Sequence, residues 1–172
     1  MILRVFTDKS QLGQAAAAQA AELINRAIAA RGQARIIAAT GMSQFEFLQA
    51  LIATPGIDWT RVEMFHLDEY VGLPPNHPES YRAVIKREIA ERVDFAPDSV
   101  HGPDGWASDI PGACAAYEEA IVAAGGIDLQ ILGVGTDGHI GFNEPISSLA
   151  SLTRIKTLTE QTREDNARFF DD

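Results

Sequence analysis

The stretch ARIIAATGMSQFEFLQALIA, residues 34–53, places an apolar run directly before a helical pattern. The first part, ARIIAAT (34–40), is nearly continuous in apolar residues, which is typical of a strand buried on both faces. The second part, SQFEFLQALIA (43–53), then predicts a helix. A strand followed by a helix is the repeating unit of an α/β fold.

The same alternation recurs on both sides of this stretch. We predict strands at ILRVF (2–6), RVEMFHL (61–67) and IDLQILGV (127–134), and helices at 10–31, 79–92 and 113–124. Gly32 ends the first helix, whose apolar face consists of Leu12, Ala16, Ala20, Leu23, Ala27 and Ile28. The chain closes with TRIKTLT (153–159) and a helical EQTREDNARFF. This order predicts a doubly wound, mainly parallel, Rossmann-like sheet with helices on both faces.

The size and composition of the chain fit one α/β domain over residues 1–172. Its 172 residues are 46% apolar and 22% charged, which excludes a disordered chain. The segment 94–112, rich in Pro, Gly and Asp, predicts a long surface connection and no domain boundary.

Charge and cysteine content limit the partners and the compartment. The net charge of −10 and the lack of a basic run make nucleic acid a poor partner. Cys114 is the only cysteine, so no intrachain disulfide forms, and we interpret it as a small, buried apolar side chain. No apolar run approaches the roughly 18 residues of a membrane span, and we expect a soluble, unprocessed cytoplasmic protein.

Three loops that follow predicted strands carry unusual chemistry: TGMSQ (40–44), FHLDEY (65–70) and GVGTDGHIGFNEP (133–145). In a parallel sheet, ligands bind outside the carboxyl ends of the strands, where such loops meet. We therefore expect these three loops to lie together at one edge of the sheet.

The third loop formally contains a dinucleotide-binding fingerprint. Gly133, Gly135 and Gly138 spell GxGxxG, and Glu160 follows at about the required distance. In that fingerprint the glycines open a helix that holds the pyrophosphate, whereas Gly141 and Pro145 interrupt any helix here. The context argues against nucleotide binding.

A metal site is a second interpretation of these loops. The available ligands are His66, Asp68 and Glu69 in one loop, and Asp137, His139 and Glu144 in another. Their spacing repeats no zinc or two-metal signature. His66 lies within an apolar strand, where a hydrogen-bonded core histidine is the simpler interpretation.

Metal-free proton transfer is the third interpretation. A histidine titrates near pH 6.5, and flanking carboxylates can fix its tautomer and stabilise its protonated form. His139 between Asp137 and Glu144 fits that description. Spacing alone also allows Asp137 to cap a turn and Glu144 to be solvated. In the first loop, Ser43 is a good N-cap, and a helix N-terminus after a glycine can bind a phosphate or simply be an ordinary cap.

Several long motifs resemble the glucosamine-6-phosphate deaminase (isomerase) family. They are LDEYVGLPPNHPESYR (67–82), GVGTDGHIGFNEP (133–145), TRIKTLT (153–159) and NARFF (166–170). The related 6-phosphogluconolactonases share the fold and a GxGxDGH segment, while FNEP and DEY with its GLP continuation resemble the deaminases. The resemblance runs from about Thr40 to the last residue.

This resemblance implies a reaction and assigns residues to it. Glucosamine 6-phosphate and water would become fructose 6-phosphate and ammonia, without metal or cofactor. Asp68 would move a proton between C2 and C1, and His139, oriented by Asp137 and Glu144, would open the sugar ring. Thr40, Gly41, Ser43 and Arg168 would hold the phosphate, which also explains how an acidic protein binds an anion.

The chain departs from the family pattern in three places. Family members usually read Gly-x-Thr-Pro in the phosphate loop, where this chain has Gly41, Met42, Ser43 and Gln44, which leaves the phosphate contacts and the sugar epimer open and keeps galactosamine 6-phosphate as an alternative. In allosteric members a stretch like TRIKTLT contributes to an effector site, which gives Ser147, Arg154 and Lys156 as candidates. Leu152 stands where an arginine is expected, so regulation stays open.

The family also continues beyond NARFF, so we expect a chain without the C-terminal elements and an exposed apolar surface near Phe169 and Phe170. A lactonase, or a sugar-phosphate-binding module without turnover, is an alternative function. The sequence leaves the oligomeric state open, including a homo-oligomer.

Overall fold

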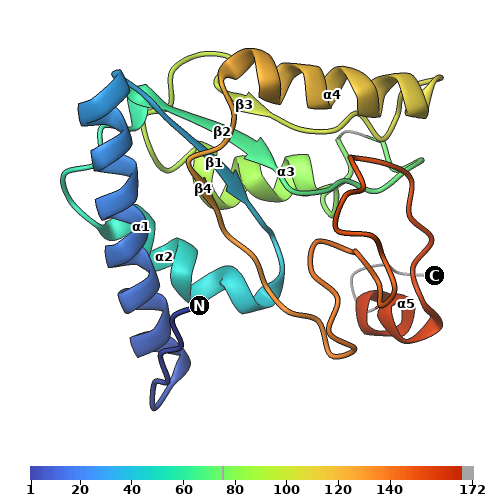
Figure 1. Cartoon of the computed structure of the whole chain (residues 1–172), viewed down its shortest axis with the longest axis horizontal. Coiled ribbons are helices and arrows are strands. Elements are labelled where there is room, and N and C mark those ends of the chain that lie inside the picture. The colour runs from blue at the N-terminus through green and yellow to red at the C-terminus, as the bar shows by residue number, and fades with distance from the viewer. Residues whose placement is uncertain (75, 168–172) are drawn as a thin grey trace.

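The computed structural model describes residues 1–74 and 76–167, which fold around a four-stranded parallel sheet (Figure 1). The strand order is β3-β2-β1-β4. The strands are β1 (Ala34–Ala38), β2 (Val62–His66), β3 (Val100–His101) and β4 (Leu129–Gln130). The central pair runs in register from Ala34 opposite Val62 to Ala38 opposite His66. The predicted α/β class and parallel sheet are confirmed.

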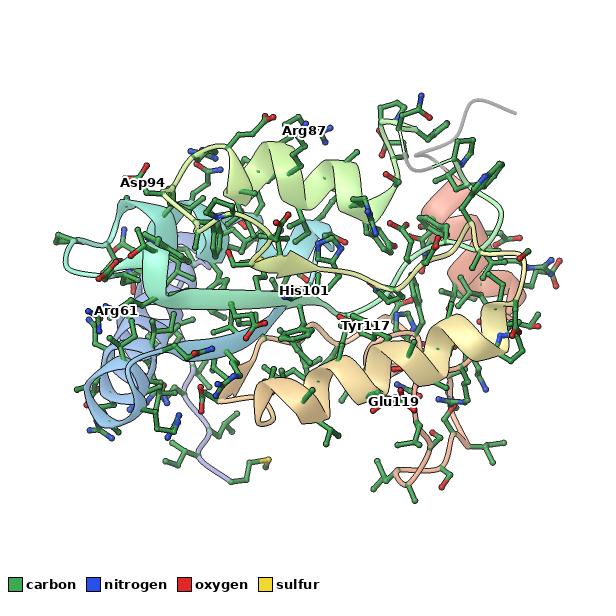
Figure 2. The ribbon with its side chains drawn as sticks, turned by 90° about the horizontal axis from the view of Figure 1, so that it is seen from above. Arg61, Arg87, Asp94, His101, Tyr117 and Glu119 are labelled. Carbon is green, nitrogen blue, oxygen red and sulfur yellow. The ribbon has the colours of Figure 1, made fainter. Side chains whose placement is uncertain are left out.

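Helices cover both faces of this sheet, as predicted. The α-helices are α1 (Lys9–Arg31), α2 (Phe45–Ala53), α3 (Tyr81–Ile85), α4 (Ile110–Ala124) and α5 (Glu160–Ala167). Helices α1, α2 and α3 share the main core with Ile36 and Met64, which lie on one face of the sheet. Helix α4 lies on the other face, where Tyr117 contacts the ring of Phe65 (Figure 2).

Close packing of α1 on α2 fixes one side of the core. The backbone of α2 passes so near Gly13 that a Cβ there would lie 2.8 Å from the carbonyl carbon of Glu46. The buried face of α1 therefore centres on Gly13, Ala17, Ala20, Ile24 and Ala27. The predicted face was rotated, since Leu12 is 48% exposed.

Two strand predictions were wrong in extent. Residues 2–6 form no strand, and Val5 is 85% exposed. The predicted strand 127–134 is reduced to Leu129–Gln130, which pairs only with β1. An edge strand needs only a short ladder, so the apolar residues beyond Gln130 continue as irregular chain.

The segment 94–112 holds a strand that the sequence did not reveal. Val100 and His101 form β3, which pairs with Met64 and Phe65 of β2. A strand of only two residues is too short to show periodicity in the sequence. Helix α4 also begins earlier than predicted, at Ile110, where Asp109 accepts a hydrogen bond from the backbone N–H of Gly112.

Smaller differences concern the other helices. The helix predicted near 79–92 consists of α3 and a π-helical turn, η3 (Lys86–Ala90). A 3-10 turn, η1 (Met42–Gln44), precedes α2, so Ser43 is not its N-cap. A second 3-10 turn, η2 (Trp59–Arg61), precedes β2. TRIKTLT is irregular, and Arg168, Phe169 and Phe170 lie outside the described residues. Among the described helices, none has the length and apolarity to cross a membrane.

Candidate active site

The three loops identified in the sequence all emerge at the carboxyl ends of parallel strands. Residues 39–44 follow β1, residues 67–70 follow β2, and residues 131–145 follow β4. The backbone N–H of Leu67 donates to the carbonyl of Ala38 at 3.1 Å, which joins the first two loops at their start. The parallel topology therefore gathers the chemistry at one edge, as expected.

His139 is held by two carboxylates. Its Nδ1 lies 2.7 Å from Oδ1 of Asp137 and 3.9 Å from Oε2 of Glu144. Asp137 Oδ1 also accepts a hydrogen bond from the backbone N–H of His139 at 3.0 Å. That backbone bond, with contributions from Glu144 and the imidazole, lowers the pKa of Asp137 to about 2. An ionised Asp137 can only accept, so Nδ1 carries the proton and Nε2 keeps its lone pair.

The glycine at position 135 lets the imidazole lie flat against the backbone. A Cβ at Gly135 would lie 2.2 Å from Cε1 of His139 and 2.5 Å from Nε2. The backbone closes the same turn, since the N–H of Gly135 donates to the carbonyl of His139 at 2.9 Å. No helix follows this turn, which confirms that the GxGxxG match lacks the context of a dinucleotide site.

Glu144 is buried, contrary to the alternative that it is solvated. It is 4% exposed, and its Oε1 accepts a hydrogen bond from the backbone N–H of Thr159 at 3.0 Å. Thr162 of α5 places its hydroxyl 3.5 Å from Nδ1 of His139. Helix α5 is also tied to the loop through Thr136, whose hydroxyl donates to Asp165. The histidine is thus enclosed by groups that fix its orientation.

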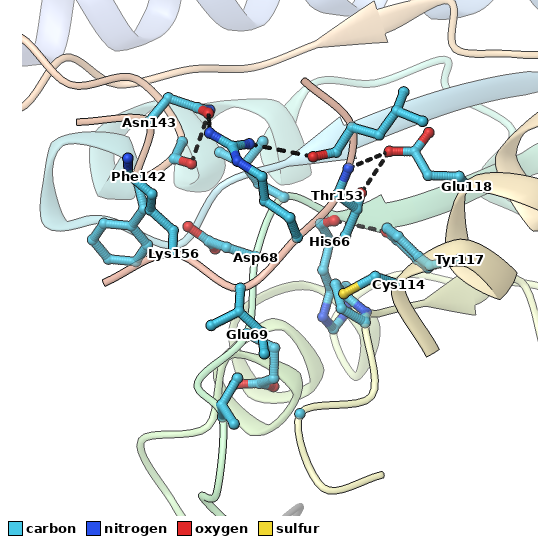
Figure 3. Close-up of a pocket in the computed structure, with 18 of the residues that line it drawn as sticks. His66, Asp68, Glu69, Cys114, Tyr117, Glu118, Phe142, Asn143, Thr153 and Lys156 are labelled. Carbon is cyan, nitrogen blue, oxygen red and sulfur yellow. Dashed lines mark hydrogen bonds between the residues drawn. The ribbon is translucent and has the colours of Figure 1, made fainter. Parts of the chain in front are cut away.

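Asp68 lines a separate cleft of about 600 Å³ between the sheet edge, α4 and residues 151–158 (Figure 3). Burial, with repulsion from Glu69 beside it, raises the pKa of Asp68 to about 7. A carboxyl group that titrates near neutrality in a cleft has the properties of a general base.

Aromatic side chains and a capped helix fix the segment around Asp68. Tyr81 donates to the hydroxyl of Tyr70 at 2.9 Å, and burial raises the pKa of both phenols. Glu69 accepts hydrogen bonds from the backbone N–H groups of Tyr81 and Arg82 at the start of α3. Glu69 is therefore a helix cap, which was not predicted.

Phe142 borders both the Asp68 cleft and the ring of His139. The ring of Phe142 lies 5.7 Å from that of His139 and 6.4 Å from that of Tyr70, and Phe142 lines the Asp68 cleft. His139 itself is not on the wall of that cleft. The loops meet as expected, but the two groups do not share one open cavity in this conformation.

The predicted phosphate-binding residues line a second cavity, of about 820 Å³. Thr40, Gly41 and Ser43 contribute to its wall together with Gly133 and Val134 of the histidine loop. Leu12, Ala16 and Leu23 of α1 form an apolar part of the same wall. Arg168, the fourth predicted phosphate contact, lies outside the described residues.

The two proposed metal-ligand sets differ in geometry. Within residues 1–74 and 76–167, Asp137, His139 and Glu144 alone bring three ligand atoms together, all within 4.8 Å of one another. His66 and Glu69 do not join Asp68 in such a cluster. His66 is buried as predicted, and burial lowers its pKa to about 4. Its ring nitrogens have no partner among the described residues, so the expected hydrogen bond was wrong.

The predicted effector residues lie on the irregular segment 145–158. Arg154 and Lys156 line the Asp68 cleft, and Arg154 donates to Oδ1 of Asn143 at 2.9 Å. Ser147 does not line it, although its hydroxyl is buried. The backbone N–H and hydroxyl of Thr153 both donate to Glu118 of α4 at 2.7 Å (Figure 3).

Several residues that build this site were not predicted from the sequence. They are Tyr117, Glu118, Phe142, Thr153 and Thr162. Tyr117 donates to the backbone carbonyl of His66 at 2.7 Å, so α4 holds the strand end that precedes Asp68. A residue that reaches the site from a distant part of the chain leaves no motif in the local sequence. Cys114 is half-buried on the cleft wall, where burial raises the pKa of its thiol.

Comparison with known proteins agrees with the motifs. Residues 7–142 match the family described as glucosamine-6-phosphate isomerases/6-phosphogluconolactonase. The chain belongs to this family. A glucosamine-6-phosphate deaminase of Arthrobacter sp. (strain FB24) is 59% identical over 156 residues, which cover 89% of this chain and 60% of that protein. One of Beutenbergia cavernae is 64% identical over 135 residues, covering 77% of this chain and 52% of that protein.

Solved structures of the family share the fold. A monomeric glucosamine-6-phosphate deaminase superposes with a TM-score of 0.92 at 34% identity, covering 99% of this chain and 70% of that one. A 6-phosphogluconolactonase from Thermotoga maritima has a TM-score of 0.71 at 23% identity, covering 84% and 63% respectively. The chain thus spans about 60% of the length of the curated relatives it matches.

Proposed function

We propose that this protein converts glucosamine 6-phosphate and water into fructose 6-phosphate and ammonia by metal-free acid–base catalysis. The observation that carries the proposal is the opposite shift of the pKa values of two carboxyl groups, one in the Asp68 cleft and one beside His139. Asp68 titrates near neutrality, and Asp137 beside His139 stays ionised. Groups whose pKa values are driven apart are typical of paired acid and base roles.

Asp68 is the base in this proposal. Moving a proton between the adjacent carbons C2 and C1 of the open-chain sugar requires a group that can accept and return it. A carboxyl with a pKa of about 7 holds and releases a proton at similar cost near neutral pH. The cleft around Asp68 has a volume of about 600 Å³, within the usual range for small ligands.

His139 opens the pyranose ring. With Nδ1–H directed to Asp137, its Nε2 takes a proton from the anomeric hydroxyl and returns one to the ring oxygen. Asp137 stabilises the imidazolium that forms in between, and Glu144 encloses it from the other side. His139 does not line the Asp68 cleft, so this proposal requires a conformational change that brings Nε2 and Asp68 to the same sugar.

The phosphate provides binding energy away from the reacting carbons. Thr40, Gly41 and Ser43, with Arg168, are the proposed contacts, because hydroxyl, backbone and guanidinium donors suit a dianion. Ser147, Arg154 and Lys156 remain candidates for an effector site. A homo-oligomer and a cytoplasmic location also remain predictions.

The direct test is an assay of ammonia and fructose 6-phosphate formed from glucosamine 6-phosphate. Parallel assays with galactosamine 6-phosphate and 6-phosphogluconolactone distinguish the epimer and lactonase alternatives. Activity should persist after treatment with a chelator. Thermal stabilisation by the sugar phosphate without any product would instead support a binding module.

A further inference from the structure

Two buried carboxylate oxygens beside His139 receive no N–H or hydroxyl donor among the described residues, and the two carboxyl groups interact only with each other there. They are Oδ2 of Asp137 and Oε2 of Glu144. The Glu144 side chain is only 5% exposed, and its free oxygen lies 3.9 Å from Nδ1 of His139. Buried acceptors without donors are costly. A cation bound beside the imidazole nitrogen would offset the cost of burying these two carboxylate oxygens.

The donor set indicates which cation. One nitrogen of His139 and one oxygen each of Asp137 and Glu144 lie within 4.8 Å of one another. Zinc binds histidine nitrogen and carboxylate oxygen, and its open sites combine three protein ligands with a water molecule, although a set with one histidine and two carboxylates is not among its usual signatures. Calcium prefers six or more oxygens, and magnesium a nearly ideal octahedron of oxygens. We infer that Asp137, His139 and Glu144 form a binding site for Zn²⁺ that inhibits the enzyme.

The bond lengths of zinc require only a small rearrangement. Zn²⁺ binds nitrogen and carboxylate oxygen at about 2.0–2.2 Å. The ion would replace the proton between Nδ1 of His139 and Oδ1 of Asp137, atoms now 2.7 Å apart. The imidazole must move slightly away from Asp137, toward the free oxygen of Glu144. The hydroxyl of Thr162, 3.5 Å from Nδ1, lies beside this path.

Metal binding at Nδ1 inhibits because it changes the tautomer of His139. The proton that Nδ1 gives up moves to Nε2, so the neutral ring binds the metal without net release of a proton. Nε2 then carries a hydrogen and no longer has a lone pair. It can no longer take a proton from a sugar hydroxyl. The inhibition rests on the proposed function, whereas the binding of the ion does not.

Binding is tested on the metal-free chain with Co²⁺ as a visible probe. Titration should produce the absorption bands of a four-coordinate Co²⁺ site, saturating at one equivalent, and Zn²⁺ should remove them by displacement. Glu144→Gln and Asp137→Asn should each weaken binding by more than about tenfold, since each removes a direct ligand. Circular dichroism checks that both variants fold.

A matched control is Glu63→Gln. Glu63 forms the other close histidine–carboxylate pair, with its Oε1 2.9 Å from Nε2 of His101, and it should leave Co²⁺ affinity unchanged. Nitrogen NMR of the wild-type imidazoles provides a readout without substitution, because the Nδ1 resonance of His139 should shift on adding Zn²⁺. Unchanged affinity in Glu144→Gln, no Co²⁺ bands, or a shift at another histidine would overturn the inference.

The two proposals fail in distinguishable ways. If the chain binds Co²⁺ through these residues but releases no ammonia, the deaminase function fails and the metal site stands. If the chain releases ammonia but Zn²⁺ neither binds at His139 nor inhibits, the metal site alone is wrong.

Discussion

Nδ1 of His139 lies 2.7 Å from Oδ1 of Asp137, so the carboxylate fixes the tautomer of the histidine. This contact gives Asp137 a role that an amide cannot fully replace. Asp137→Asn keeps the size of the side chain but can present its N–H₂ to the ring and favour the wrong tautomer. We expect kcat to fall by roughly 10²–10⁴-fold, the range for losing acid–base catalysis. Unchanged kcat with intact folding would refute the tautomer argument.

The ionisation of Asp68 should destabilise the fold as pH rises. Its pKa rises from 3.8 to about 7 on folding, mainly through burial, so the folded state holds the proton more tightly. The free energy of unfolding therefore decreases between these two pH values. Asp68→Asn removes that loss. Its Tm should exceed that of the wild type at pH 8, with a difference that shrinks toward pH 4.

The control for this comparison is Asp94→Asn, at an exposed carboxylate on the connection after η3 (Figure 2). Its Tm difference from the wild type should show no such trend. A Tm difference between Asp68→Asn and the wild type that stays constant across the whole pH range would show that burial does not raise the pKa of Asp68.

Gly135→Ala should displace the imidazole of His139. The added Cβ would lie 2.2–2.5 Å from three ring atoms of His139, so the ring must move away from Asp137. Activity should fall by more than tenfold, about the effect of a misplaced catalytic group. Gly56→Ala is the control, because it meets open space and suffers only backbone strain at φ +86°. It should cost about 1 kcal/mol of stability and no activity.

Glu118→Ala should release the segment 151–156 from α4. Glu118 accepts two hydrogen bonds from Thr153 at 2.7 Å. A hydrogen bond to a charged group contributes up to about 3 kcal/mol to stability. We expect lower thermal stability and faster proteolysis near Thr153. Glu119→Ala, at the exposed neighbouring position, is the matched control. Equal cleavage rates in the two variants would contradict the role assigned to Glu118.

The sequence predicted the fold where burial is two-sided and elements are long. ARIIAAT and RVEMFHL became β1 and β2 because they occupy the sheet centre, where both faces are covered. ILRVF has the same pattern but does not join the sheet, and apolar composition does not reveal which segments pair. The two-residue strand β3 could not be predicted, because its pairing with β2 comes from the assembled sheet.

The part of the candidate site whose residues lie close together in the sequence was predictable. Asp137, His139 and Glu144 share one loop, and the structure brings them together. The neighbourhood of Asp68 was only partly predictable, because Tyr81 and Tyr117 reach it from two other elements, α3 and α4. The raised pKa of Asp68 depends on burial, which appears only after folding.

The most direct test of the proposed mechanism is ammonia release from glucosamine 6-phosphate by chelator-treated wild type, Asp68→Asn and His139→Gln. The wild type should form ammonia and fructose 6-phosphate in equal amounts, and both variants should lose this activity while keeping the circular dichroism of the wild type. Ammonia release by either variant at the wild-type rate, or no release by the wild type, would contradict the proposal.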